Sequence, residues 1–328
     1  MESFTKQTPQ FLRQENAIIR RCLDQTLWKP AEEFLSRPSK RFRGQLVTHA
    51  FTLVSGRDSL TVEEQSLCAK GAQLLEQIHA GSLVVDDIQD DSLLRRGKPT
   101  LHRLVGIPTA LNTGNWMYFQ PLEAIRHWGL DASTELRLYR ACHFALVQAH
   151  HGQALDVGIA IDQVERSEVR SICLASLELK TGALMELASV IGAILGQGSD
   201  SEVETLGEFG KSFGIALQML DDIGNALAKK SEDPKRFEDL KLKRPTWVWA
   251  VVSEMEDQQW DRFLSAVNDL PKTESLAAFF ETGALSAAHT QAEQYLSLAI
   301  TQLGESFGEV KAVKEIREMG SLLLKAYR

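Results

Sequence analysis

Four aspartates lie within six residues, and their crowding is the clearest chemical signal in the chain: Asp86, Asp87, Asp90 and Asp91. Residues 74–85 before them are apolar at helical spacing, so we expect the aspartates at the C-terminal end of a mostly buried helix. The helix dipole is also negative at that end. Carboxylates packed this closely repel one another unless a cation lies among them. The pattern therefore indicates a divalent metal ion, with a solvated acidic helix end as the alternative.

Helical geometry divides these aspartates into two sets. Asp86 and Asp90 are four residues apart and share one helix face, whereas Asp87 and Asp91 point elsewhere. A calcium-binding loop is excluded because Ile88 occupies a ligand position and the turn glycine and terminal glutamate are missing. We therefore expect Asp86 and Asp90 to bind the metal, and Asp87 and Asp91 to support them or to face solvent.

A second pair of aspartates also ends an apolar helix. Asp221 and Asp222 follow residues 213–220, and Gln218 and Asn225 fall close to the face of Asp221. Inward carboxylates on facing helices are a common way to build a metal site in a helical bundle. A set of oxygen ligands favours magnesium, which usually keeps waters and bridges to substrate phosphates. The two pairs together predict a phosphorylated, metal-bound substrate.

The composition is that of an ordinary globular protein. Of 328 residues, 44% are hydrophobic and 24% charged, and the net charge of −8 comes without a basic stripe that would suggest nucleic acid. The most apolar run, residues 182–198, is interrupted by Glu186 and is too short for a membrane span. The N-terminus lacks an apolar signal core. The cysteines are isolated from one another, which argues against a zinc site or disulfides and predicts reduced thiols and a cytoplasmic location: Cys22, Cys68, Cys142 and Cys173.

Apolar residues recur at three and four positions along most of the chain, which predicts a single all-α domain over residues 1–328. The loops near 94–106 and 228–243 are polar and irregular. Helices are expected at residues 10–27, 41–55, 61–92, 107–127, 132–161, 165–196, 200–227, 244–254, 257–268, 273–281, 284–303 and 308–326.

The two acidic motifs resemble those of the trans-isoprenyl diphosphate synthases, or polyprenyl synthetases, of the farnesyl and geranylgeranyl diphosphate synthase type. Asp86 to Thr100 is similar to that family's first motif, DDxxD followed by Arg-Arg-Gly and Pro-Thr. The segment from Gln218 is similar to the second motif, with Asn225 in place of its last aspartate. The resemblance covers about residues 37–247. It implies an all-α bundle of about 10–13 helices around a central cavity.

The resemblance also implies an activity and partners. Members of the family form homodimers, bind three magnesium ions and join isopentenyl diphosphate to an allylic diphosphate. The expected reaction is a 1′-4 head-to-tail condensation that gives an all-trans polyprenyl diphosphate. Asp86, Asp90 and Asp221 would bind magnesium. The backbone carbonyl of Lys180, with Thr181 and Gln218, would stabilise the allylic cation.

Basic residues at matching positions would hold the two diphosphates. The isopentenyl diphosphate set implied by the resemblance is Lys40, Arg43, His79 and Arg96. The allylic diphosphate set is Arg95, Lys180, Lys235 and Arg244. The sequence departs from the family pattern in two places. Ser39, before Lys40, stands where glycine is usual, and Arg244 replaces a lysine. Taken singly, most of them have a structural interpretation, such as a solvated helix start, a core histidine or a lysine that reaches water.

The resemblance implies that product length depends on the helix face below Asp86. Gly81 and Ser82, one turn earlier, are small, whereas bulky aromatic residues at this place stop chain growth early in the family. The expected product is therefore C20 or longer, with C15 kept open because residues 116–119 on the next helix include three aromatic side chains.

Two other functions remain open from the sequence. A class I terpene cyclase of the same fold would also ionise an allylic diphosphate, and Asn225 keeps that alternative open. A non-catalytic subunit of a heteromeric prenyl synthase would be expected to have lost acidic or basic ligands, and few are lost here.

Overall fold

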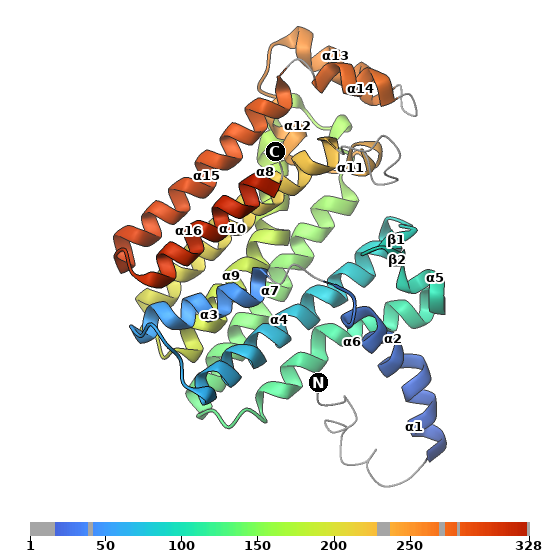
Figure 1. Cartoon of the computed structure of the whole chain (residues 1–328). Helices are drawn as coiled ribbons and strands as arrows, with labels where there is room; N and C mark the ends of the chain where they lie inside the picture. Colours follow the sequence, from blue (N-terminus) through green and yellow to red (C-terminus); the bar gives the residue numbers. More distant parts are fainter. Residues whose placement is uncertain (1–16, 39–41, 228–236, 269–272, 281–282, 327–328) are drawn as a thin grey trace. The chain divides into compact units, whose positions relative to one another are not determined.

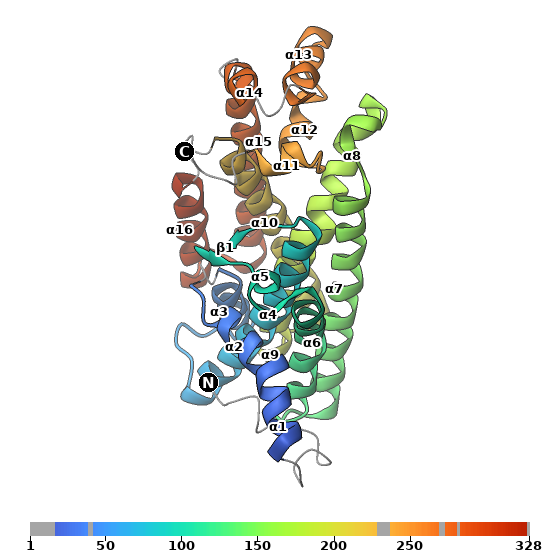
Figure 2. The same ribbon diagram turned by 90° about the vertical axis from the view of Figure 1, so that its right-hand side faces the viewer.

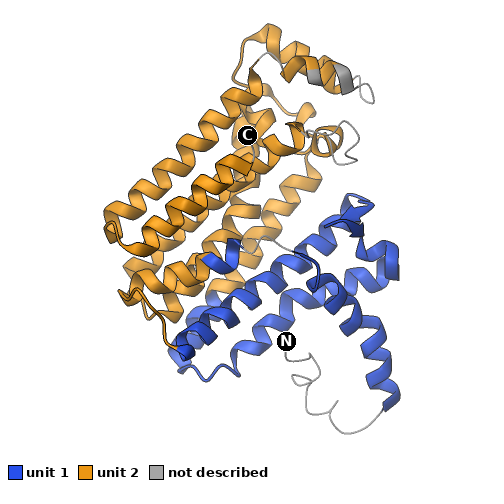
Figure 3. Cartoon of the chain, in the orientation of Figure 1, with its two compact units in different colours: residues 1–45, 62–140 blue, residues 46–61, 141–328 orange. Residues whose placement is uncertain are grey.

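The computed structural model describes residues 17–38, 42–227, 237–268, 273–280 and 283–326. These residues form two compact units (Figure 3). Unit 1 comprises residues 1–45 and 62–140, and unit 2 comprises residues 46–61 and 141–328. The chain crosses between the units inside α3 (Phe42–Ser55), directly before Val62, and inside α7 (Ala132–Gly158). The expectation of a single domain stays a prediction.

Unit 1 is built mainly on two long helices, α4 (Val62–Gln89) and α6 (Ile107–Ile125), which pack side by side (Figure 1). Its shorter elements are α1 (Ala17–Leu23), α2 (Lys29–Leu35), the strands β1 (Leu94–Arg95) and β2 (Lys98–Pro99), and α5 (Leu101–Val105). The two strands form an antiparallel hairpin in which Arg95 pairs with Lys98.

The core of unit 1 fixes the end of α4 that carries the aspartates. Phe34 of α2, Val84 of α4, Leu101 of α5 and Met117 of α6 are buried in one apolar cluster, with Trp116 packed against it. Burying such side chains removes apolar area from water at about 25 cal/mol per Å². Trp116 and Met117 therefore have a packing role in this core.

Unit 2 is a bundle around α9 (Ala183–Leu195) and α10 (Asp200–Leu227), which pack against each other. Helices α15 (Ala284–Phe307) and α16 (Lys311–Ala326) lie side by side in Figures 1 and 2, and α15 also packs on α10. The other helices are α8 (Arg166–Leu177), α11 (Glu238–Lys241), α12 (Trp247–Val252), α13 (Asp257–Asn268) and α14 (Thr273–Phe280).

Small residues allow α9 and α10 to approach closely. A Cβ atom at Gly214 would lie 2.7 Å from Met185 Cβ, and one at Gly210 would lie 2.5 Å from the carbonyl oxygen of Met185. Almost every residue of α9 is buried, as expected for the apolar run 182–198. Among the described helices, none combines the length and the apolar character needed to cross a bilayer.

Most predicted helices are present within a few residues of their expected ends, but the prediction was wrong in four places. Residues 238–241 of the expected loop 228–243 form the helix α11. The first helical segment does not stop at 27. A π-helical turn, Asp24–Trp28, runs directly into α2, and Pro30 lies in the first turn of α2. Residues 94–106 form the hairpin and α5 rather than an irregular loop. The segment 165–196 is divided by a second π-helical turn, Glu178–Gly182.

Candidate active site

Helix α4 ends in a hydrogen-bonded cap formed by the aspartate motif itself. The Ser92 N–H donates to the carbonyl oxygen of Asp87 at 3.0 Å, and the Asp91 N–H donates to that of Ile88 at 3.3 Å. Asp91 has a φ of 50°, the left-handed conformation that glycine usually takes in this cap. The Asp90 N–H still donates to the Asp86 carbonyl at 3.0 Å, so these two aspartates keep the helical register that places them on one face.

Asp87 is the buried member of the first aspartate pair. Its side chain is fully buried, and its Oδ1 accepts from Arg95 Nε at 2.7 Å and lies 2.6 Å from Arg95 Nη2. Arg95 Nη2 also lies 3.5 Å from Asp86. A buried carboxylate needs such a partner because desolvating an unpaired charge is costly. Asp91, by contrast, is exposed and pairs with Arg103 at 2.5 Å.

The β1–β2 hairpin presents the second arginine at its tip. Arg96 and Gly97 have φ values of 54° and 76°, as in the tight type I′ turn that suits a two-residue hairpin. Glycine adopts this conformation freely, whereas a residue with a Cβ is strained in it. Strained backbone of this kind is found most often at functional sites, which supports a functional role for Arg96.

His79 is surrounded by cations. Burial is the largest influence on its pKa and lowers it well below the usual value, and the charges of Arg43, Arg96 and Arg95 lower it further. Its Nδ1 is buried and has no hydrogen-bond partner among the residues that the structure describes. We call His79, Arg43 and Arg96 the His79 cluster. Three of the four residues expected to hold isopentenyl diphosphate thus lie near one another, and the fourth, Lys40, lies outside the described residues.

In unit 2, the π-helical turn Glu178–Gly182 carries Lys180 and Thr181. Lys180 Nζ donates to Asp156 Oδ2 at 2.6 Å, and Thr181 Oγ1 donates to Gln218 Oε1 at 2.6 Å. The carbonyl of Asp156 also accepts from Arg244 Nη1 at 2.9 Å. Single π-helical turns are rare and occur often at functional sites. Within unit 2, Asp156 therefore joins Lys180 and Arg244, and a separate hydrogen bond joins Thr181 and Gln218. Lys235 lies outside the described residues.

The second aspartate pair shows the same division as the first. Asp222 is buried and accepts from Gln218 Nε2 at 2.8 Å and from the Trp247 N–H at 2.7 Å. Burial raises its pKa well above the usual value, and the charge of Asp239 adds to this shift. Asp221 is exposed. In both pairs the first carboxylate is the more accessible and the second is fixed inside the protein.

Asp239, at the start of α11, was missed in the sequence. Burial raises its pKa from 3.8 to about 7, with further upward contributions from Asp156 and Glu238, against a downward one from Lys180. In the sequence it is one of several acidic residues in the polar segment 228–243, which was predicted to be a loop. Only its proximity to Asp156 and Lys180 in space marks it as part of the site.

The carboxylates fit the way magnesium is usually bound. Within the described ranges, no three His, Cys, Asp or Glu side chains form a complete metal cage. Magnesium seldom needs such a cage, because it keeps water ligands and is held by one or two carboxylates together with substrate phosphates. The accessible oxygens of Asp86 and Asp221 are suited to that role.

The absence of a side chain at Gly81 is explained by the packing of α4 against α6. A Cβ atom there would lie 2.7 Å from the Gly114 carbonyl oxygen and 2.9 Å from Met117 Cβ on α6. Gly81 is therefore required for the close packing of α4 on α6, and its part in chain-length control stays a prediction. Ser82 is half-buried, and its hydroxyl donates to the His79 carbonyl at 2.8 Å.

The chain is similar to known proteins over most of its length. Residues 24–282 match the sequence profile of the family described as Polyprenyl synthetase. The chain belongs to the polyprenyl synthetase family. Its identification as an enzyme of the trans-prenyltransferase class is thereby confirmed.

The similarity to individual members of the family covers most of the chain. The geranylfarnesyl diphosphate synthase of Aeropyrum pernix is 30% identical, over 86% of this chain and 88% of the relative. The geranylgeranyl diphosphate synthase of Sulfolobus acidocaldarius is 29% identical, over 85% of this chain and 84% of the relative.

Solved structures confirm the all-α fold. The geranylgeranyl pyrophosphate synthetase of Pyrococcus horikoshii has a TM-score of 0.79 at 24% identity, covering 92% of this chain and 90% of its own. A decaprenyl diphosphate synthase from Rhodobacter capsulatus has a TM-score of 0.74 at 22% identity, covering 89% of this chain and 87% of its own.

Proposed function

We propose that this polyprenyl synthetase condenses isopentenyl diphosphate with an allylic diphosphate, in 1′-4 head-to-tail fashion, to an all-trans polyprenyl diphosphate of C20 or longer. The observation that carries the proposal is the His79 cluster. It gathers arginines around a buried histidine and includes no carboxylate, which suits a second diphosphate bound without metal. A class I terpene cyclase ionises one allylic diphosphate and has no use for this cluster.

In this proposal Lys40, Arg43, His79 and Arg96 bind isopentenyl diphosphate. The lowered pKa of His79 keeps the imidazole neutral, so it adds a hydrogen-bond donor without adding to the repulsion among the arginines. Arginine suits diphosphate because its planar guanidinium donates two hydrogen bonds at once.

The allylic diphosphate is assigned to Arg95, Lys180, Lys235 and Arg244, with magnesium held by Asp86, Asp90 and Asp221. Bound magnesium, for which three ions are expected, supplies Lewis-acid stabilisation of the leaving diphosphate. The contacts of Arg95 with Asp87 and of Lys180 with Asp156 hold these cations in place before substrate binds. Such preorganised charge is the usual source of transition-state stabilisation.

The chemistry then follows from charge placement. The allylic C–O bond breaks, and the diphosphate leaves with the electron pair. The double bond of isopentenyl diphosphate attacks the allylic cation, and the departed diphosphate takes the proton that is lost. The backbone carbonyl of Lys180, Thr181 Oγ and the oxygen of Gln218 are assigned to stabilise the cation, consistent with the hydrogen bond that orients Thr181 toward Gln218.

Product length is proposed from the relatives and from Ser82. The relatives named above are geranylgeranyl and geranylfarnesyl diphosphate synthases, whose products have 20 and 25 carbons. Gly81 is accounted for by helix packing, so of the two small residues Ser82 is the one that we assign to chain-length control. The cytoplasmic location also stays a prediction.

We also propose that two copies of the chain form the active homodimer. Helix α6 exposes Ile107 (54%), Leu111 (39%) and Phe119 (67%) in the single chain. Large apolar side chains exposed at repeated positions of one helix often mark a protein–protein interface. A non-catalytic role in a heteromer is disfavoured because both aspartate pairs and the His79 cluster are intact.

The assignment of metal ligands is tested by three single variants at saturating magnesium. Asp86→Ala and Asp221→Ala are each expected to lower kcat by about a hundredfold or more, because each removes charge that stabilises the transition state. Asp91→Asn is the matched control, since Asp91 belongs to the same motif but is exposed, and asparagine tolerates its left-handed backbone conformation. Near-normal turnover in Asp86→Ala or Asp221→Ala would overturn the assignment.

A further inference from the structure

A buried arginine outside both aspartate motifs lies just after α2. Arg37 has a side chain with no exposed surface, although it follows the last turn of a short helix and precedes the segment with Lys40 and Arg43. Its guanidinium lies 4.9 Å from the centre of the Phe34 ring, a distance typical of a cation–π contact. A charged group is rarely buried to this extent unless every donor is used.

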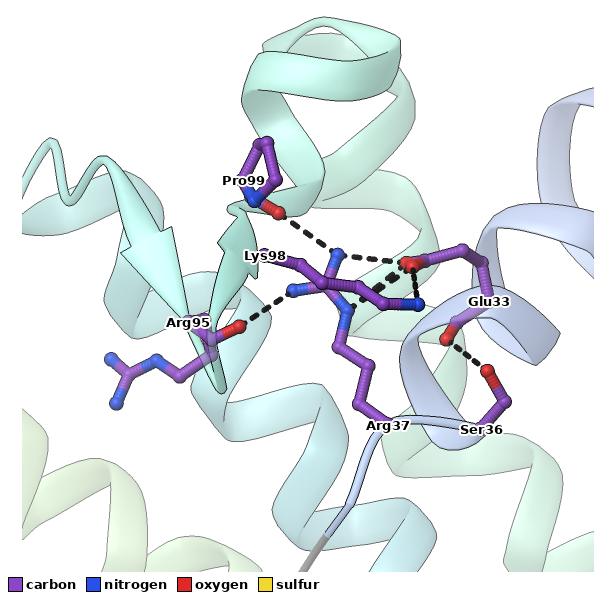
Figure 4. Close-up of polar contacts among 6 residues, drawn as sticks. All are labelled: Glu33, Ser36, Arg37, Arg95, Lys98 and Pro99. Carbon is purple, nitrogen blue, oxygen red and sulfur yellow. Dashed lines mark hydrogen bonds and ion pairs between the residues drawn. The ribbon is translucent and has the colours of Figure 1, made fainter.

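The donors of Arg37 connect α2 to both strands of the β1–β2 hairpin (Figure 4). Nη1 donates to the carbonyl oxygen of Arg95 on β1 at 3.1 Å, and Nη2 donates to that of Pro99 on β2 at 2.9 Å. One rigid guanidinium therefore fixes the spacing of the two strands on either side of the tip.

Glu33 holds this guanidinium from the other side. Its carboxylate accepts from Arg37 Nε at 3.1 Å and from Nη2 at 2.8 Å, and Lys98 Nζ lies 3.3 Å away. Burial alone would raise the pKa of Glu33, but the hydrogen bonds and charges of Arg37 and Lys98 lower it. We call Arg37 and Glu33 the Arg37 brace.

The Arg37 brace binds the two strands on either side of the turn that contains Arg96. Arg96 occupies a left-handed conformation at the tip, which persists only where the surroundings impose it. Its guanidinium lies 5.8 Å from the same Phe34 ring that Arg37 contacts. The side chain of Arg95 has its own anchor on Asp87. Losing the brace is therefore expected to affect Arg96 more than Arg95.

We propose that Arg37 is a positioning residue for isopentenyl diphosphate, which it serves by holding the hairpin so that Arg96 stays in the His79 cluster. The inference rests on the proposed function, because it assumes that this cluster binds the second diphosphate. It gives a role to a residue that no motif in the sequence singles out.

The test compares Arg37→Met and Arg37→Lys with the full-length wild-type chain. Isopentenyl diphosphate alone, which cannot react without an allylic partner, is titrated calorimetrically. We expect its Kd to rise about tenfold in Arg37→Met, equivalent to about 1.4 kcal/mol. In steady-state assays the KM for isopentenyl diphosphate should rise similarly while kcat stays within about twofold, the pattern of lost substrate binding.

Arg37→Lys separates positioning from simple charge. Lysine keeps the charge beside Glu33 but has no planar guanidinium to span two carbonyls. The melting temperature of Arg37→Lys should therefore stay near that of the wild type, while its binding of isopentenyl diphosphate should be weakened as in Arg37→Met. Arg126→Met is the matched control, because it removes an exposed arginine–glutamate pair, Arg126–Glu123, in the same unit. It should leave Kd, KM and kcat unchanged.

The outcomes also distinguish this inference from the proposed function. If Arg96→Met weakens binding of isopentenyl diphosphate but both Arg37 variants bind it like the wild type, the positioning role is wrong and the proposed function stands. If the wild type does not bind isopentenyl diphosphate at all, the proposed function itself fails. A fall in kcat and melting temperature without a change in Kd would assign Arg37 to stability alone.

Discussion

In each aspartate pair, the two carboxylates differ in burial and therefore in what they can do. Asp87 and Asp222 are buried and bonded to the protein, whereas Asp86 and Asp221 keep accessible surface. A buried carboxylate that already accepts strong hydrogen bonds is poorly placed to exchange them for a metal ion. This supports Asp86 and Asp221 as ligands and gives the neighbouring aspartates a role in holding Arg95 and Gln218.

Sequence spacing could predict part of this division. The four-residue interval of Asp86 and Asp90 follows from helix geometry, and the cap at Asp91 preserves it. The bond from Arg95 to Asp87 could not be predicted, because it depends on a hairpin of two-residue strands turning back toward α4. Asp239 was missed for the same reason, since burial beside Asp156 is a property of the folded chain.

Asp239 predicts a dependence of stability on pH. Its pKa is raised from 3.8 to about 7, so the folded chain holds this proton more tightly than the unfolded chain. The resulting stabilisation is fully present below the unfolded pKa and is lost as the pH rises through about 7. Asp239→Asn, which stays neutral, should therefore raise the melting temperature in magnesium-free buffer more at about pH 8 than at about pH 5. Equal melting-temperature changes at the two pH values would contradict the shift.

At the scale of elements, the long helices were predictable and the short connections were not. Helix α10 begins and ends where its apolar periodicity does, at Asp200 and Leu227. The π-helical turn Glu178–Gly182 could not be predicted, because apolar spacing at three and four residues does not distinguish an α-helical turn from a single π-helical one. The hairpin was missed because two residues a strand cannot show alternation.

Gly81 provides a test at this scale. Gly81→Ala places a Cβ against the backbone of α6 and should destabilise the protein by about 1–3 kcal/mol, as is typical of an overpacked core. The free energy of unfolding by denaturant measures this. Gly158→Ala is the control, because a Cβ at this exposed residue of α7 would meet nothing within 4 Å. An unchanged stability in Gly81→Ala would show that α4 and α6 can separate freely.

For the whole molecule, the all-α class and the family follow from sequence, while the division into two compact units does not. Two of the three points where the chain crosses between the units fall inside the helices α3 and α7, where no linker marks them. Composition shifts reveal domain boundaries only when the chain leaves regular structure between domains.

The proposed homodimer is tested by its mass in solution. Light scattering should give the wild type the mass of two chains, and the double variant Leu111→Glu/Phe119→Glu the mass of one, because charge on a buried interface is costly. Leu322→Glu is the control, since Leu322 of α16 is also a strongly exposed apolar residue (64%). A wild type that is monomeric at assay concentrations, or a double variant that stays dimeric, would exclude α6 as the interface.

The central claim is condensation of two diphosphates, and product analysis tests it most directly. The full chain is incubated with magnesium, isopentenyl diphosphate and, in turn, C5, C10 and C15 allylic diphosphates, and the products are resolved by chain length. The account predicts consumption of isopentenyl diphosphate and linear all-trans products of C20 or longer. Cyclic hydrocarbon formed from the allylic diphosphate without consumption of isopentenyl diphosphate would contradict it.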